Sequence, residues 1–198
     1  DINHLERFIN IGSSDEYGQN EAPQLESMNT MPISPYSLGK VYQTDFLKML
    51  FEKDEIPTTT LRAFLVFGPN QKSNRFLPYV INSCLKNESF KCTQGIQIRD
   101  FCYVDDFVNA IFKSMKNNKV NGEIINVASG EPISIKDMTL KIVSIIGKGN
   151  PMFGEISIRE NENLSLYADI TKAKQLLCWK PKISVDDGLN ITINSFKN

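Results

Sequence analysis

The sequence predicts an α/β fold in which an incomplete, doubly wound parallel sheet is followed by a small α+β lobe. Apolar, β-rich segments alternate with segments whose apolar residues recur at helical spacing. The segments at residues 7–13, 36–52 and 58–67 succeed one another as strand, helix and strand, the order of a βαβ unit. We expect residues 1–72 to form the partial sheet region. Residues 73–198 are expected to form mainly the second lobe, with some segments returning to the sheet.

The first three elements have clear local signals. RFINIGS, at residues 7–13, carries no charge after Arg7, which is typical of a strand buried on both faces of a parallel sheet. A polar, Pro-containing loop precedes the helix at residues 36–52. TTTLRAFLVF, at residues 58–67, is β-branched and aromatic and ends at a Gly-Pro pair, which indicates a second strand.

The later elements are shorter and more mixed. Helices are predicted at residues 76–86, 104–116, 134–146, 169–177 and 185–196, and strands at residues 97–103, 123–128 and 156–159. Ser134 and Asp169 are expected to cap the helices that begin there. The sequence shows neither an internal repeat nor a low-complexity linker.

Composition narrows the function to small-molecule chemistry. The formal net charge of the 198 residues is −1 and basic residues are scattered singly, so nothing indicates a partner nucleic acid or anionic membrane. Because no apolar run could span a bilayer and DINHLERF lacks signal-peptide features, we expect a cytoplasmic protein. The cysteines form no C-x-x-C pair and His4 is the only histidine, so we expect structural thiols and no metal site.

Two short motifs contain residues suited to acid/base chemistry. In SPYSLGK, Tyr36 and Lys40 stand four apart, on one face of the predicted helix. A free phenol has a pKa of about 10 and is a poor base at neutral pH, but a neighbouring ammonium favours its phenolate. Spacing alone is more simply explained by a solvated lysine beside a core tyrosine. GSSDEYG, at residues 12–18, favours a site, because it places hydroxyls and a carboxylate at the carboxyl end of a parallel strand, where α/β sheets bind ligands.

GSSDEYG, SPYSLGK, LRAFLVFGPNQ, QIRDFCYVDD and NVASGEPIS occur in the order seen in extended short-chain dehydrogenase/reductases that act on nucleotide sugars. The sequence resembles that family over nearly its whole length. The family includes UDP-galactose 4-epimerase, nucleotide-hexose 4,6-dehydratases and 4-keto-6-deoxyhexose reductases. The resemblance implies a Rossmann-like fold and NAD- or NADP-dependent modification of a nucleoside-diphosphate hexose around C4, for cell-surface polysaccharide or deoxysugar biosynthesis.

The resemblance also implies roles for individual residues. Tyr36 is the catalytic acid/base, Lys40 holds the nicotinamide ribose and favours the Tyr36 phenolate, and Ser13 hydrogen-bonds the reacting sugar oxygen. Asp15 stands where the dehydratases have a glutamate that removes the C5 proton, whereas SSDEYG as a whole looks closest to the reductases. Dehydration, epimerisation and reduction therefore all remain open. Ser14 is either a substrate contact or a cap of the following turn.

A substrate diphosphate needs fixed cations, and arginine can bind phosphate oxygens with two hydrogen bonds. Arg99 in QIRDF and Arg159 in ISIRE match the positions that hold the diphosphate in the family. Arg75 in NRFLPYV, at the start of a predicted helix, is a further candidate. Asp100 and Asp105 are expected to be an arginine partner and a helix cap rather than catalytic groups.

Two residues depart from the usual family pattern and a third matches it. Glu16 replaces a residue that is normally apolar, and we expect it to be a solvated turn residue. Leu65 in RAFLVFG stands where many relatives place an asparagine that hydrogen-bonds the sugar, which favours a deoxygenated or otherwise atypical hexose. Trp179 in LLCWKP resembles the family's Leu-Gly-Trp-x-Pro ending and is expected to pack the last helix.

The glycines nowhere form the G-x-x-G-x-x-G turn that holds the cofactor pyrophosphate in such folds. We therefore expect a fragment without the dinucleotide-binding start, inactive alone and without cofactor affinity. Many relatives dimerise through the Tyr-Lys helix, so a homodimer is expected for the intact protein. The alternative hypothesis is a non-catalytic module that binds a nucleotide sugar or serves assembly.

Overall fold

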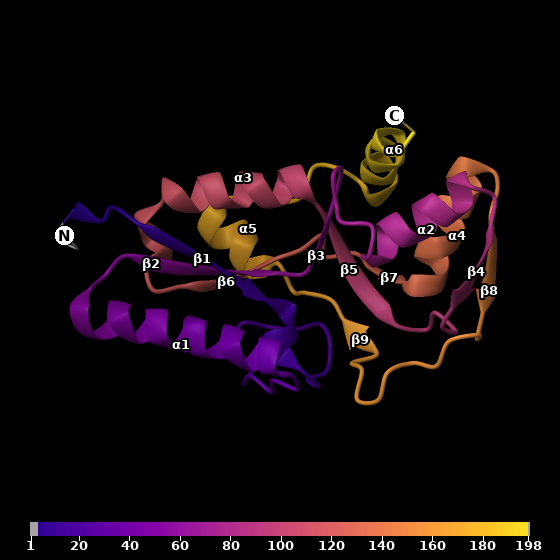
Figure 1. Ribbon diagram of the computed structural model, residues 1–198. Helices are drawn as coiled ribbons and strands as arrows, with labels where there is room; N and C mark the ends of the chain where they lie inside the picture. Colours follow the sequence, from indigo (N-terminus) through magenta and orange to yellow (C-terminus); the bar gives the residue numbers. More distant parts are fainter. Residues whose placement is uncertain (1–3, 198) are drawn as a thin grey trace.

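The structure is a computed structural model that describes residues 4–197, and it shows the mixed α/β architecture predicted from the sequence (Figure 1). The strands are β1 (Phe8–Ser13), β2 (Thr58–Ala63), β3 (Leu65–Phe67), β4 (Ser89–Cys92), β5 (Ile98–Tyr103), β6 (Ile124–Val127), β7 (Pro132–Ser134), β8 (Asn150–Phe153) and β9 (Ser165–Leu166). The helices are α1 (Pro35–Asp54), α2 (Phe76–Leu85), α3 (Val104–Met115), α4 (Ile135–Ile146), α5 (Thr171–Leu177) and α6 (Val185–Ser195), with short 3-10 helices η2 (Ser14–Tyr17) and η3 (Asn118–Val120).

The first sheet is parallel and has the order β1-β2-β6. β1 pairs with β2 along its whole length and α1 connects them, so the predicted βαβ unit is confirmed. β6 returns to this sheet from the later part of the chain, beside β2. Figure 1 shows α1 on one face of the sheet and α3 with α5 on the other. The side chains between the sheet and α3 and α5 form an apolar core that includes Leu61, Ile125, Phe107, Ala110, Ala173 and Leu177.

The predicted strand at residues 58–67 is interrupted at Phe64. Its first part, β2, stays in the first sheet, while β3 pairs in parallel with β5 in a second, mixed sheet that also contains β7 and β9. Phe64 is buried, and its N–H donates to the Val127 carbonyl at 3.3 Å, which holds the chain where it crosses between the sheets. The carboxyl ends of β1 and β2 therefore face the junction of the two sheets.

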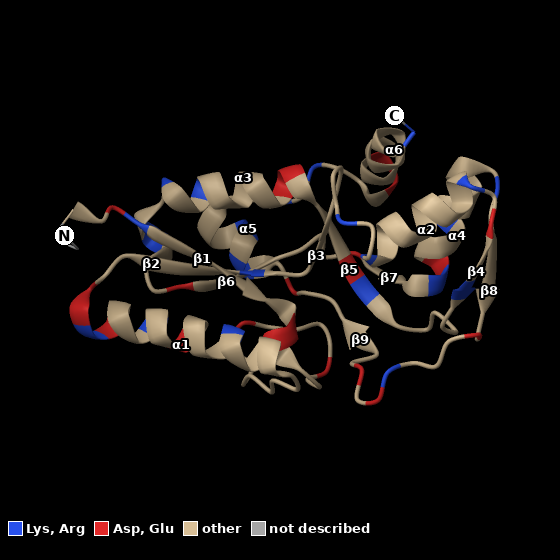
Figure 2. Cartoon of the chain, viewed as in Figure 1, with Lys and Arg blue, Asp and Glu red and all other residues tan. Residues whose placement is uncertain are grey.

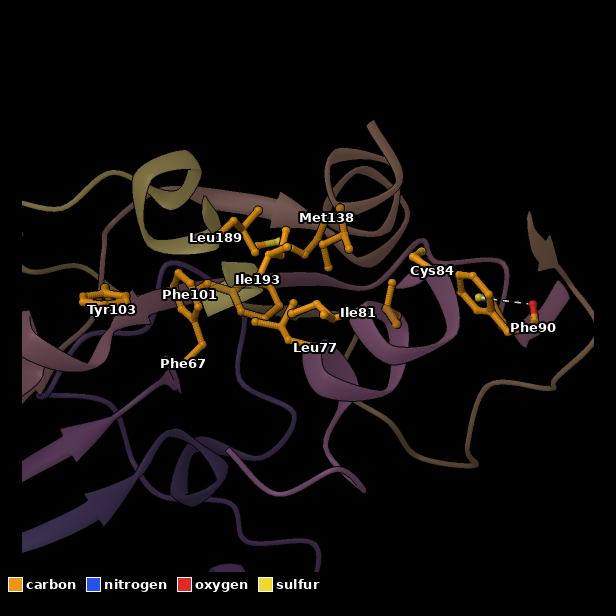
Figure 3. Close-up of a cluster of buried hydrophobic side chains, with 13 residues drawn as sticks. Phe67, Leu77, Ile81, Cys84, Phe90, Phe101, Tyr103, Met138, Leu189 and Ile193 are labelled. Atoms are coloured by element: carbon orange, nitrogen blue, oxygen red, sulfur yellow. Dashed lines mark hydrogen bonds between the residues drawn. The ribbon is translucent and has the colours of Figure 1, made fainter. Parts of the chain in front are cut away.

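The second core lies among α2, α4, α6 and β5 (Figure 3). It contains Phe67, Leu77, Ile81, Phe101, Met138, Leu189 and Ile193, all fully or almost fully buried. β4 and β8 form a separate two-stranded parallel sheet that was not predicted. The predicted strand at residues 156–159 is wrong: these residues form no strand, and β8 ends just before Gly154, whose φ of +88° turns the chain.

Helix starts follow the predicted chemistry in part. Ser134 caps α4 by accepting a hydrogen bond from Asp137 N at 2.9 Å. α5 begins at Thr171 rather than at Asp169, although Asp169 Oδ1 accepts from Thr171 N at 2.7 Å. Asp105 lies within the first turn of α3 and is not its cap, since the residue before that turn is Tyr103.

Two aspartates tie distant segments together. Asp100 is not an arginine partner, contrary to expectation: it is fully buried and accepts from Ser129 N, Ser129 Oγ and Gly130 N at 2.6, 2.6 and 2.9 Å. These three hydrogen bonds take up both carboxylate oxygens and join β5 to the loop after β6. Asp106 is also buried and accepts from Lys182 N at 3.0 Å. Trp179 is buried, but it lies in the core beside α3 and α5 rather than in the core that contains the last helix, and its Nε1 donates to the Asp106 carbonyl at 3.0 Å.

Cys84, Cys92 and Cys102 are buried free thiols, whereas Cys178 is exposed. Burial raises the pKa of Cys84 to about 11. Between residues 4 and 197, no group of three or more metal-ligating side chains occurs. No helix in that same part of the chain is long and apolar enough to cross a membrane.

Candidate functional site

The site begins where β1 ends. Ser13 has extended backbone, and its hydroxyl oxygen accepts from Asp15 N at 3.2 Å as the chain turns into η2. The backbone N–H of Ser13 donates to Glu16 Oε1 at 2.8 Å, so side chain and backbone of one short turn hold each other. Because the Ser13 hydroxyl acts as an acceptor in this turn, its proton is available to a ligand oxygen. Ser14 follows it and is buried at 4% exposure.

The start of α1 places Tyr36 and Lys40. Ser34 caps the helix and Pro35 occupies its first turn, so Tyr36 projects from the amino end. The Tyr36 side chain is 59% exposed, and the Lys40 ammonium lies 6.0 Å from the centre of its ring. Lys40 Nζ also donates to the Ile11 carbonyl at 2.9 Å. The lysine therefore bridges α1 and β1, on the same helix face as the phenol.

The charges of two guanidiniums act on the Asp15 carboxyl group of this turn. Burial raises the pKa of Asp15, while the positive charges of Arg99 and Arg75 act in the opposite direction. Arg99 lies on β5 and is 9% exposed, and Arg75 precedes α2. Figure 2 shows acidic and basic residues interspersed along the described part of the chain.

Arg99 is already paired. Its Nη2 donates to Glu162 Oε1 at 2.8 Å and its Nη1 to the Ile98 carbonyl at 2.8 Å. Burial lowers the pKa of Arg99, and the charge of Glu162 opposes that effect. No sequence pattern pointed to Glu162, which lies 63 residues farther along the chain.

Arg159 belongs to the same turn as Glu162 but is exposed. The turn is closed by Glu162 N donating to the Arg159 carbonyl at 3.2 Å. Asn163 Nδ2 donates to the Gly18 carbonyl, which tethers this turn to the segment that follows η2. A cavity of about 740 Å³ lies between the two segments, lined by Gln19, Asn20, Glu21, Ile33 and residues 161–165. Arg159 does not line it.

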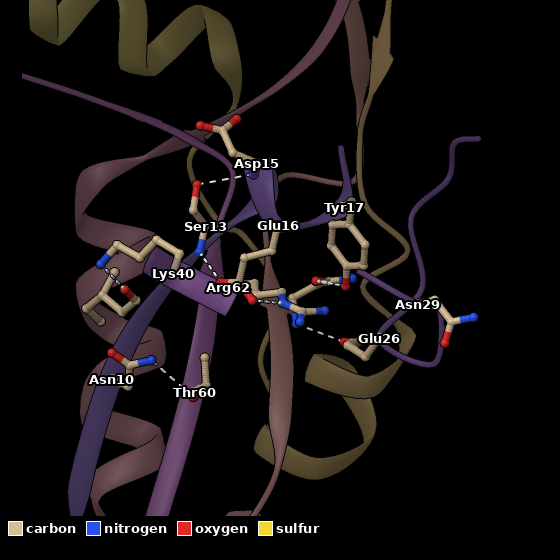
Figure 4. Close-up of polar contacts among 12 residues, drawn as sticks. Asn10, Ser13, Asp15, Glu16, Tyr17, Glu26, Asn29, Lys40, Thr60 and Arg62 are labelled. Carbon is tan, nitrogen blue, oxygen red and sulfur yellow. Dashed lines mark hydrogen bonds and ion pairs between the residues drawn. The ribbon is translucent and has the colours of Figure 1, made fainter. Parts of the chain in front are cut away.

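The expectation that Glu16 is a solvated turn residue is wrong. Glu16 is fully buried, and its Oε2 accepts from Arg62 Nε at 2.9 Å (Figure 4). Arg62 is 2% exposed, with its guanidinium carbon 4.6 Å from the centre of the Tyr17 ring. A signal was present in the sequence, because Arg62 is the one charge within TTTLRAFLVF and a buried charge requires a partner.

Comparisons with known proteins identify the family of the chain. The model of the NAD dependent epimerase/dehydratase family matches residues 1–128. An uncharacterized UDP-glucose epimerase of Bacillus subtilis is 30% identical over 191 residues, which are 93% of this chain and 58% of that protein. CDP-abequose synthase of Salmonella typhimurium is 30% identical over 83% of this chain and 56% of its own length.

Solved structures give the same result. UDP-glucuronic acid 4-epimerase from Bacillus cereus, in complex with UDP-glucuronic acid and NAD, has a TM-score of 0.89 at 30% identity and covers 96% of this chain and 61% of its own. UDP-glucose 4-epimerase from Thermotoga maritima, with UDP-glucose, has a TM-score of 0.92 at 27% identity and covers 99% and 65%. This chain thus spans about three fifths of the length of such relatives. The fold is Rossmann-like, and the chain belongs to the NAD-dependent epimerase/dehydratase family of extended short-chain dehydrogenase/reductases.

Proposed function

We propose that this chain carries the acid/base and substrate-binding residues of an enzyme that uses NAD or NADP to modify a nucleoside-diphosphate hexose around C4. The observation that carries the proposal is the exposed Tyr36 phenol beside the Lys40 ammonium, next to the end of β1. Relatives named for UDP-glucose, CDP-abequose and dTDP-glucose support a nucleotide sugar as the substrate class.

The donor set at α1 fits the nicotinamide ribose of such a cofactor. Lys40 presents an ammonium and Tyr36 an exposed phenol, and both can hydrogen-bond ribose hydroxyls. Bound there, the cofactor would supply hydride acceptance and return at a sugar carbon. The B. cereus relative is described as a complex with NAD, which supports a nicotinamide cofactor.

Residues of this chain carry out the proton transfers. The Tyr36 phenol oxygen, beside the Lys40 ammonium, takes a proton from the sugar hydroxyl at C4 or returns one to the keto oxygen. Ser13 donates its hydroxyl proton to the same sugar oxygen, in the orientation fixed by the Asp15 N–H. This geometry is shared by epimerisation, dehydration and keto reduction.

Asp15 is the residue through which these reactions differ. Burial raises its pKa, which suits a carboxyl group that exchanges a proton with the sugar. A dehydratase requires that exchange at C5, whereas a reductase does not. Leu65, 38% exposed on β3, offers an apolar surface where many relatives have asparagine, and this favours a deoxygenated hexose.

The substrate diphosphate is assigned to the cations near Asp15. Arg99 on β5 is the principal ligand, with Arg75 and the exposed Arg159 as further contacts. Ser14 is retained as a substrate contact, although its burial leaves little of the side chain accessible.

The whole protein is proposed to be a homodimer formed through α1. This helix exposes Leu38, Tyr42 and Phe46 at 40, 65 and 56%, an apolar row with helical spacing. Sedimentation of the full-length protein as a monomer would contradict this proposal.

The test is turnover by full-length protein with NAD or NADP and a panel of UDP-, dTDP- and CDP-hexoses. We expect Tyr36→Phe to lower kcat by about 10²–10⁴-fold, the usual contribution of a general acid/base. Tyr42→Phe is the matched control, since Tyr42 lies on the same helix with 65% exposure and should leave turnover unchanged. Undiminished turnover in Tyr36→Phe would refute the assignment. Nucleotide binding without any reaction would favour the non-catalytic module.

A further inference from the structure

A buried ion pair lies directly beneath the turn that carries Ser13. Glu16 is 0% exposed and Arg62 is 2% exposed, and their Oε2 and Nε atoms are 2.9 Å apart. An ionised carboxylate without solvent is costly unless it is paired and hydrogen-bonded. Both oxygens of Glu16 are used, because Oε1 accepts from Ser13 N at 2.8 Å.

The backbone leaves room for this carboxylate. A side chain at Gly12 would place its Cβ 2.6 Å from Glu16 Oε1 and 2.9 Å from Thr60 Cγ2. Such contacts are shorter than van der Waals distance, so the glycine at the end of β1 is needed for Glu16 to fold back beneath Ser13. The requirement is one of space between β1 and β2.

Arg62 also contacts the tyrosine at the end of η2, which is itself bonded to β6. Its guanidinium carbon lies 4.6 Å from the centre of the Tyr17 ring, and Tyr17 OH donates to Asn126 Oδ1 at 2.7 Å (Figure 4). Asn126 belongs to β6, so the contacts run across all three strands of the first sheet. Arg62 Nη1 has no hydrogen-bond partner among the described residues, so the Glu16 carboxylate is the main group that compensates the buried Arg62 charge.

We propose that Glu16 and Arg62 are positioning residues, which fix Ser13 and Asp15 for the reaction by anchoring the Ser13 amide to the sheet. The pair does not touch the solvent side of the turn, because both side chains are buried. It acts through Ser13 N, and the Ser13 hydroxyl then orients Asp15 N at 3.2 Å. The proposal rests on the proposed function, since it assigns these two residues to the same site.

Two variants test it. Glu16→Gln keeps the shape but offers one carbonyl oxygen to two donors, so either Ser13 N or Arg62 Nε loses its acceptor. The double variant Glu16→Leu with Arg62→Met removes both charges together, which avoids an uncompensated buried ion, and removes the acceptor of the Ser13 amide. Circular dichroism and thermal unfolding establish that each variant is folded. If the double variant does not fold, Glu16→Gln carries the test.

The first readout is kinetic, in the full-length protein. We expect kcat to fall at least tenfold, up to about a hundredfold, because small displacements of reacting groups have effects of that size. KM for the nucleotide sugar should change less than twofold. The value of kcat is calculated per folded enzyme, so that a loss of folded protein does not appear as a lower kcat. Glu123→Gln is the matched control: Glu123 pairs with Lys172 at 2.7 Å, before β6 rather than at its carboxyl end. It should leave kcat unchanged.

The second readout does not depend on turnover. Amide hydrogen exchange at Ser13 should become at least tenfold faster in the double variant, because its N–H has lost the buried acceptor. Unchanged protection of Ser13 would overturn the proposal, and so would lost protection with an unaltered kcat. If the wild-type protein converts no nucleotide sugar, the proposed function fails, while exchange at Ser13 still decides whether the pair anchors this turn.

Discussion

Replacing Asp100 with asparagine is expected to destabilise the fold. This carboxylate, fully buried on β5, accepts from Ser129 N and Ser129 Oγ through Oδ1 and from Gly130 N and Ala168 N through Oδ2. Asparagine offers one oxygen and one NH₂ group in the same space. With the NH₂ group in place of Oδ2, Gly130 N and Ala168 N both face a donor. With the NH₂ group in place of Oδ1, Ser129 N faces a donor and the Ser129 hydroxyl loses the acceptor to which it donates.

The size of the effect follows from these contacts. A buried donor that loses its acceptor costs about 1–3 kcal/mol. The contact from Ala168 N is long, at 3.4 Å, and counts at the low end of that range. The sum is about 3 kcal/mol of unfolding free energy. For a chain of this size, Tm falls by about 2–4 °C per kcal/mol, so the variant should melt about 6–12 °C below the wild type.

The measurement is thermal and urea-induced unfolding at pH 7, followed by circular dichroism. Asp137→Asn is the matched control, because Asp137 accepts from Ser134 Oγ at the exposed start of α4. It should cost less than about 1 kcal/mol. If Asp100→Asn costs no more than Asp137→Asn, the accounting of buried donors around Asp100 is wrong.

Two further predictions concern the cations of the site. Arg99→Gln should raise the pKa of Asp15 further, because a nearby cation favours the carboxylate; carboxyl NMR titration measures this, and a lower pKa would contradict it. Because the pKa of Asp15 is raised in the folded state, the protonated Asp15 stabilises the fold at pH values below its unfolded-state pKa. This stabilisation is lost as the pH rises through the folded-state pKa, and Arg99→Gln should move the loss to higher pH. In calorimetry, Glu162→Gln should bind UDP or dTDP about fivefold more tightly, a gain of about 1 kcal/mol in binding free energy, because the diphosphate no longer has to displace a carboxylate from Arg99. Weaker binding would show that Glu162 assists nucleotide binding.

Local signals predicted the elements that local interactions determine. The βαβ unit of β1, α1 and β2 is readable because each segment has its own periodicity and composition. The break at Phe64 is not readable in this way, since the apolar pattern continues through it and only the pairing of β3 with β5 shows that the strand changes sheets. Residues 156–159 alternate like a strand but form no ladder, and only Ile156 N reaches β4, where it donates to the Cys92 carbonyl at 3.1 Å. β8 contains Pro151 and is nevertheless stabilised by pairing with β4.

The same distinction between local and long-range interactions applies to the candidate site. Tyr36 and Lys40 are one helical turn apart, so their proximity follows from sequence spacing. The burial of Glu16 depends on Arg62, 46 residues away, and on the space left by Gly12. The pattern around Glu16 does not contain that information, and the signal lies in the apolar strand that carries Arg62. A charge at a position that is apolar in relatives was therefore interpreted as solvated, when its counter-charge stood in the next strand.

The arginines that the sequence presents as alike are separated by their surroundings. Arg62 is buried against Glu16 and Tyr17 and is committed to the sheet. Arg99 is almost as buried, yet its partner Glu162 comes from an exposed turn, so an incoming diphosphate can replace that carboxylate without leaving a charge uncompensated. A guanidinium that is already desolvated and held in place loses less on binding than one on a free side chain. Arg99 is therefore the cation from which we expect the largest contribution to nucleotide affinity.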